Sequence, residues 1–237
     1  MDRVIVILGS GPGIGVGVAS HFAEQGFNRV ALVARNTERL AIDASRVKSA
    51  AEAAKKDVTV KTYSVDVTDV AKFEGVLGNI VQELGKPEVV VYNAVRIGRG
   101  SFFKQTEESV NYDFKITTLG LYTTARVLMP HLLSHVGSAG RNPALLVSSG
   151  GLYKTPHHAL FSLSLSKASQ HNMTESLSQR FAGEGVHVAS VVVHGLVRPD
   201  SPHFSPSKIA EVFWKLYGQG ADGETDVWVT DGTDPKL

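Results

Sequence analysis

The residues with the clearest chemistry are three glycines close to the N-terminus. Gly9, Gly13 and Gly15 lie in GSGPGIG, directly after an apolar run and before a helical pattern. Glycine allows the positive φ of a tight turn and lets the backbone approach a bound group closely. A helix N-terminus adds unpaired N–H groups and the positive end of the helix dipole, which suit a phosphate. The stretch therefore predicts a dinucleotide-binding loop, and the alternative is a tight turn without a ligand.

The second apolar run ends in VALVARN and indicates which dinucleotide is bound. An acidic residue at this strand end would bind the ribose hydroxyl of NAD, whereas Arg35, followed by Asn36, favours the 2′-phosphate of NADP. Arginine suits phosphate because its guanidinium donates paired hydrogen bonds as well as carrying charge. We expect NADP as the cofactor, with NAD less favoured. The alternative is that Arg35 is a solvated surface residue.

These residues need a scaffold, and the hydrophobic pattern predicts it. Runs rich in β-branched residues predict strands at 4–8, 30–34, 58–65, 89–92, 144–149, 186–193 and 226–230. Helical patterns lie between them, at 13–26, 36–56, 69–85, 107–136, 159–184 and 206–218, the last with Ser207 as its N-cap. Strands that are apolar throughout are buried on both faces, which favours a parallel sheet. We expect one α/β domain over 1–237, a doubly wound, Rossmann-type sheet of about seven strands with helices on both faces.

Composition excludes several classes of function. The formal net charge of the 237 residues is +1, without blocks of like charge, so no basic surface for nucleic acid is expected. The chain has no cysteine, and its histidines lack metal-binding spacing, so no metal site is expected. No apolar run is long enough to span a membrane. We therefore expect a cytoplasmic protein that acts on a small molecule, without nucleic-acid or membrane partners.

Several motifs together resemble those of the short-chain dehydrogenase/reductase family, over nearly the whole chain. GSGPGIG resembles the family's TGxxxGIG loop, with Leu8 in place of threonine, and VYNAV resembles its NNAG segment. LLVSSGG resembles the strand end that carries the catalytic serine, and Lys167 matches the lysine of YxxxK. GEGVHVASVVVHG resembles the strand that leads to the family's PG, with His194 in place of proline.

The resemblance implies roles for individual residues. Ser149 would hydrogen-bond the substrate, Lys167 would hold the nicotinamide ribose, and Asp66 would contact the adenine ring. The cofactor-binding residues that it implies are Gly9, Ser10, Gly13, Ile14, Gly15, Arg35, Asn36, Asp66, Val67, Asn93, Ala94, Lys167, His194, Gly195 and Val197. It also implies a homodimer or homotetramer formed through the helices at 107–136 and 159–184.

Two positions depart from the family pattern. The family's proton-carrying tyrosine stands four residues before the lysine, where this chain has Leu163. Thr117 occupies the place of the asparagine that supports a proton relay in the family. Because general acid–base groups contribute about 10²–10⁴-fold to rate, these changes should remove most ordinary ketoreductase activity unless another group substitutes.

Residues near these positions offer substitutes. Tyr153, in the loop after Ser149, is the candidate replacement acid, with His157 and His158 as alternatives, although loop aromatic residues commonly serve packing. Three serines flank Leu163 and are expected to bond the backbone at a helix start: Ser162, Ser164 and Ser166.

The loop after the fourth apolar run carries two arginines. Arg96 and Arg99 are candidates to bind an anionic substrate, or are solvated loop residues.

Three functions compete on this reading. The favoured one is an NADP-dependent oxidoreductase of the short-chain type with a remodelled proton donor, suited to imines or activated alkenes. The second is a non-redox isomerase, dehydratase or cyclase that uses the same cleft. The third is a catalytically silent NADP-binding protein, because a fold alone does not establish function.

Overall fold

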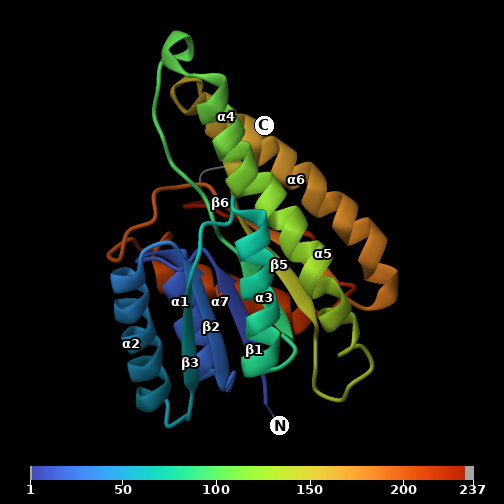
Figure 1. Cartoon of the computed structure of the whole chain (residues 1–237). Coiled ribbons are helices and arrows are strands. Elements are labelled where there is room, and N and C mark those ends of the chain that lie inside the picture. Colours follow the sequence, from blue (N-terminus) through green and yellow to red (C-terminus); the bar gives the residue numbers. More distant parts are fainter. Residues whose placement is uncertain (1, 233–237) are drawn as a thin grey trace.

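The computed structural model describes residues 2–232 and contains a seven-stranded sheet (Figure 1). The strand order is β3-β2-β1-β4-β5-β6-β7, and all neighbouring strands are parallel. The strands are β1 (Val4–Leu8), β2 (Arg29–Ala34), β3 (Thr59–Ser64), β4 (Val89–Tyr92), β5 (Ala144–Gly150), β6 (His187–Val193) and β7 (Asp226–Val229). This confirms the predicted doubly wound parallel sheet.

Helices cover both faces of the sheet and enclose two hydrophobic cores. One face carries α1 (Ile14–Glu24), α2 (Thr37–Ala53) and α7 (Pro206–Gln219). The other carries α3 (Val70–Leu84), α4 (Glu107–Phe114), α5 (Gly120–Leu133) and α6 (Phe161–Phe181). Every residue of β1, β4 and β6 is buried, which explains their continuous apolar sequences.

Short helical segments join these elements. They are η1 (Phe102–Lys104), η3 (Gly151–Tyr153), η4 (His158–Leu160) and η5 (Ala182–Glu184), together with η2 (Lys115–Leu119), a π-helical turn. The helix expected at 107–136 is therefore interrupted, because η2 lies between α4 and α5. Of the helices between residues 2 and 232, none combines the length and apolar character needed to cross a bilayer.

The predicted cap of the last helix was wrong. Ser205, not Ser207, is the N-cap of α7, and its hydroxyl accepts a hydrogen bond from the Lys208 N–H at 3.3 Å. Pro206 occupies the first helical position, where its missing N–H costs nothing. The proline thus fixes the helix start directly after Ser205.

Candidate functional site

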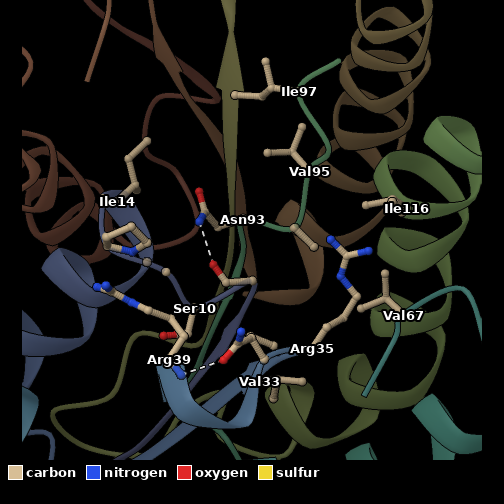
Figure 2. A pocket seen from close by; sticks show the side chains of 18 of the residues that line it. Ser10, Ile14, Val33, Arg35, Arg39, Val67, Asn93, Val95, Ile97 and Ile116 are labelled. Carbon is tan, nitrogen blue, oxygen red and sulfur yellow. Dashed lines mark hydrogen bonds between the residues drawn. The ribbon is translucent and has the colours of Figure 1, made fainter. Parts of the chain in front are cut away.

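A cavity of about 480 Å³ opens at the carboxyl ends of β1, β2, β3 and β4. Figure 2 shows side chains from the glycine loop, the end of β2 and the segment after β4 around the same space. The predicted cofactor-binding residues that line it are Gly9, Ser10, Gly13, Ile14, Gly15, Arg35, Asn36, Asp66, Val67, Asn93, Ala94 and Val197. Ligands of open parallel sheets bind at this edge, so the sequence motifs and the cavity agree in place.

Packing explains two of the loop glycines, and the cavity accounts for the third. Gly9 has φ +94°, and a side chain there would overlap the backbone of Asn93 and Ala94. A Cβ on Gly15 would lie 2.7 Å from the Gly9 carbonyl oxygen, which itself accepts a hydrogen bond from Asn93 Nδ2 at 2.8 Å. Gly13 lines the cavity, and a Cβ there would meet only Val197, at 3.7 Å. The loop is therefore held against β4 while its outer part stays open to a ligand.

Arg35 lies at the end of β2 and is exposed to the cavity. Its Nη1 lies 3.0 Å from the Tyr112 hydroxyl and 3.9 Å from Asp66 Oδ2. Burial raises the pKa of Asp66, but hydrogen bonds from Thr68 and Tyr112 outweigh it and hold the pKa below its usual value. The Asp66 carboxylate therefore stays ionised and anchors the Arg35 guanidinium on this side.

Arg39 is a cavity residue that the sequence analysis missed. It lies in the first turn of α2 and lines the opposite side of the cavity from Arg35 (Figure 2). Arg39 Nε donates to Asp43 Oδ1 at 2.8 Å, and the Ser10 hydroxyl donates to Asp43 Oδ2 at 2.8 Å. The fully buried Asp43, itself on α2, thus ties the glycine loop to this helix and also holds Arg39. The available signal was the position of Arg39 in the first turn of the helix that follows β2, because that turn starts at the carboxyl end of the sheet where ligands bind.

Ser149 and Lys167 lie beyond the cavity lining, at the end of β5 and on α6. The Ser149 hydroxyl is buried and has no hydrogen-bond partner among the described residues. Lys167 Nζ donates to the Ser148 carbonyl oxygen at 2.9 Å and to Gln170 Oε1 at 2.7 Å. Burial lowers the pKa of Lys167 to about 7, so the amine changes its protonation state near neutral pH. Leu163 is buried one turn earlier on α6 and offers no polar group.

Tyr153 is placed away from the lining of the cavity. Its hydroxyl donates to Asp226 Oδ2 at 2.6 Å, and its ring stacks on His171 at a centroid distance of 3.8 Å. Burial and the hydrogen bond to Asp226 raise the pKa of Tyr153. Because its pKa is raised, the Tyr153 phenol is a weaker acid than free tyrosine near neutral pH, which disfavours it as the replacement proton donor.

Other predicted residues also have structural partners. The His157 ring accepts a hydrogen bond from the Ala159 N–H at 3.1 Å, and stacks on exposed His158. His194 packs against Trp228, at a centroid distance of 5.9 Å. Neither His194 nor Gly195, which packs against Phe204, belongs to the cavity lining.

Two expectations for the neighbouring loop and helix are corrected. Arg96 Nε pairs with buried Asp113 at 2.5 Å, so its charge is already neutralised by protein. The Ser162 hydroxyl also binds Asp113, at 2.6 Å, rather than the backbone. Ser164 and Ser166 do bond backbone carbonyls, as expected. Arg99 is exposed.

The fold and the cavity define a dinucleotide-binding α/β protein, and comparison with known proteins gives the family. Residues 3–203 match the short chain dehydrogenase family, and the chain belongs to it. An uncharacterized oxidoreductase of Staphylococcus saprophyticus is 27% identical over 190 residues, which cover 80% of this chain and 76% of that protein.

Two solved structures show the same fold. L-sorbose reductase from Gluconobacter frateurii, in complex with NADPH and L-sorbose, has a TM-score of 0.85 at 20% identity and covers 100% of this chain and 97% of that chain. The NADPH-bound short chain oxidoreductase from Pseudomonas aeruginosa PAO1, described as containing an atypical catalytic center, has a TM-score of 0.82 at 21% identity. That match covers 99% of this chain and 98% of the other.

Proposed function

We propose that this protein is an NADP(H)-dependent oxidoreductase whose proton-carrying tyrosine is replaced by Leu163. The observation that carries the proposal is Arg35, which stands at the end of β2 and lines the same cavity as the glycine loop, with Arg39 across the cavity from it. An arginine at the end of β2 suits a phosphate on the adenosine ribose better than a free hydroxyl, and Arg39 on α2 adds a second guanidinium to the cavity lining. The family membership supports oxidoreductase chemistry of the short-chain type.

The cavity fits a dinucleotide in its shape and its charge. Gly13 leaves open space beside the N-terminus of α1, where backbone N–H groups would bind the pyrophosphate. Asp66 and Val67 would border the adenine, and Asn93 and Ala94 would border the ribose nearer the reaction centre. NADPH would supply a hydride when bound.

The chain's own groups limit which substrates suit the reaction. The buried Ser149 hydroxyl, which has no hydrogen-bond partner among the described residues, would donate to a substrate heteroatom, and the buried amine of Lys167 bonds the carbonyl of the preceding residue, Ser148. A carbonyl needs a proton as it accepts a hydride, and Leu163 cannot supply one. A protonated imine already carries that proton, and an activated alkene can take it at a carbon from solvent. We therefore infer a small imine or activated alkene as the substrate.

Nucleotide affinity tests the proposal. Calorimetric titration with NADPH and NADH should show preference for NADPH, and Arg35→Ala or Arg39→Ala should each weaken NADPH binding about 10-fold to 100-fold. Binding of NADH should change little, because it has no 2′-phosphate. Arg46→Ala is the matched control, since Arg46 is an exposed arginine of α2 outside the cavity. Equal loss in all three variants, or no binding of either nucleotide, would reject the proposal.

A further inference from the structure

The Lys167 amine lies in an interior site without an opposite charge. The residue is 7% exposed, and its amine donates to two uncharged oxygens, the Ser148 carbonyl and Gln170 Oε1. Burial alone accounts for the lowered pKa of this lysine. The two acceptors therefore determine how far the charged form of the amine is stabilised in this buried site.

Ionisable groups on the elements packed against α6 do not bond Lys167. These groups are Glu107, Glu108, Tyr112 and Asp113 of α4, Lys115 of η2, Tyr153 of η3, His158 of η4, Glu184 of η5 and His187 of β6, and Tyr112 donates to Asp66. Each is exposed or bonded to a different residue. On α6 itself, His171 and Glu175 lie toward Tyr153. Strand β5 carries no ionisable side chain. The two neutral acceptors of Lys167 are thus the groups that most directly affect the pKa of its amine.

The π-helical turn η2 supplies the anchor for one of these partners. The Gly120 N–H donates to the Lys115 carbonyl, five residues earlier, instead of to Ile116. The Ile116 carbonyl accepts a hydrogen bond from the buried Tyr92 hydroxyl. The next carbonyl, that of Thr117, accepts one from Gln170 Nε2 at 3.0 Å. Side chains from β4 and α6 thus bind successive carbonyls of the turn.

We propose that Gln170 is the positioning residue of Lys167, since its amide connects the Lys167 amine to the π-helical turn. The amide group of Gln170 accepts from Lys167 with its oxygen and donates to Thr117 with its nitrogen, so neither end is free to turn. Gln170 is 1% exposed, and no other orientation of the amide would satisfy both neighbours. Gln170 therefore fixes where the Lys167 amine lies and how firmly it holds its proton.

This inference deepens the proposed function and rests on it only for the effect on nucleotide binding. The opposing reading is that Gln170 merely fills the interior. The two readings differ in the titration of Lys167. A packing role predicts no change in that titration when the side chain keeps its volume, whereas a positioning role predicts shifts of opposite sign for an apolar and a charged replacement.

The titration can be followed by NMR in protein labelled at the lysine ε-carbons, with the Lys167 signal assigned by its loss in Lys167→Met. The wild-type midpoint should lie near pH 7. Gln170→Met removes an acceptor and should lower the midpoint by about one unit. Gln170→Glu supplies a carboxylate and should raise it by about one to three units. Thr174→Val is the control, because it deletes a buried hydroxyl one turn further along α6 that bonds the Gln170 backbone carbonyl.

Three outcomes are informative. Shifts of opposite sign in the two Gln170 variants, with an unchanged midpoint in Thr174→Val, support the proposal. The same midpoint in all of them overturns it. If Gln170→Met does not fold, the upward shift in Gln170→Glu decides alone, and its absence overturns the proposal.

These titration measurements need no nucleotide. If wild type fails to bind NADPH, the proposed function fails while the role of Gln170 remains decided by the titration. If it binds, Gln170→Met should weaken NADPH binding at pH 7 by at least about threefold, through loss of lysine charge and position.

Discussion

Leu163 and Lys167 lie one helical turn apart on α6, and both are buried. In the family pattern, a tyrosine at the first position would donate a proton beside the lysine. Leu163→Tyr should therefore increase carbonyl reduction by about 10²–10⁴-fold, the range typical of a general acid. NADPH oxidation with a panel of small ketones measures this. Leu165→Tyr is the control, because Leu165 is half-exposed two residues away. A folded, NADPH-binding Leu163→Tyr protein without any gain would contradict the assigned position.

The buried amine of Lys167 also makes stability depend on pH. Its pKa is about 7 in the native state and 10.5 in the reference state. Between these values the unfolded chain holds a proton that the native chain lacks, so raising the pH favours folding. The free energy of unfolding should rise by at most about 1.4 kcal/mol per pH unit from this group. The stability advantage of Lys167→Met over wild type should therefore shrink from pH 7 toward pH 10.5.

Urea unfolding at several pH values measures that difference. Lys48→Met is the control, since Lys48 is exposed on α2 and should give no such trend. A constant difference between Lys167→Met and wild type over the same range would show that the native amine keeps its proton.

At the residue level, the sequence predicted the groups that belong to local motifs. The glycine loop, Arg35 and Asp66 stand at the ends of recognisable strands, so their place in the cavity followed from topology. The roles of Gln170 and Asp43 were not predictable, because each also bonds a residue far away in the chain, at separations of 53 and 33 residues. Proximity to Ser149 in sequence makes Tyr153 a candidate acid, yet its hydroxyl donates to Asp226 on β7.

Among the elements, the π-helical turn depends on a glycine. The buried Tyr92 hydroxyl lies where a side chain on Gly120 would be, directly after the turn. Gly120→Ala should therefore destabilise the protein by about 1–3 kcal/mol through overpacking. Gly75→Ala, on α3 with open space around the new methyl group, should instead stabilise by up to about 1 kcal/mol. Denaturant unfolding of both variants tests this pair, and a similar effect in each would contradict it.

Strands were the most predictable elements, and helix interruptions the least. Apolar runs coincide with β1, β4 and β6 because these inner strands are buried on both faces, whereas β3, at the sheet edge, has no fully buried residue. The π-helical turn inserts its extra residue within a continuous helical pattern, so hydrophobic spacing over 107–136 did not reveal it. The start of α7 was misplaced because Ser205 and Ser207 both have capping chemistry, and only the position of Pro206 distinguishes them.

For the whole molecule, exposed apolar side chains on neighbouring helices favour self-association. Tyr122 on α5 is 54% exposed, and Leu165 on α6 is 49% exposed. We expect a homodimer or homotetramer formed through these helices. Leu165→Arg should dissociate this oligomer, because the charge would be buried at the contact. Val70→Arg, at a 47% exposed site on α3, should leave the oligomer intact. Sedimentation velocity gives the answer, and a wild-type monomer would reject the expectation.

The strand order also determines the sequence in which the sheet can assemble while the chain is being synthesised. Synthesis delivers β1 to β3 first, then β4 on the free side of β1, and afterwards β5, β6 and β7 at successive outer edges. No later strand has to enter between two that are already paired. All residues that line the cavity except Val197 have therefore been made before Ser149 and Lys167 leave the ribosome. A nucleotide that bound so early would stabilise a half-built sheet, and the coenzyme would act as a folding aid before any chemistry began.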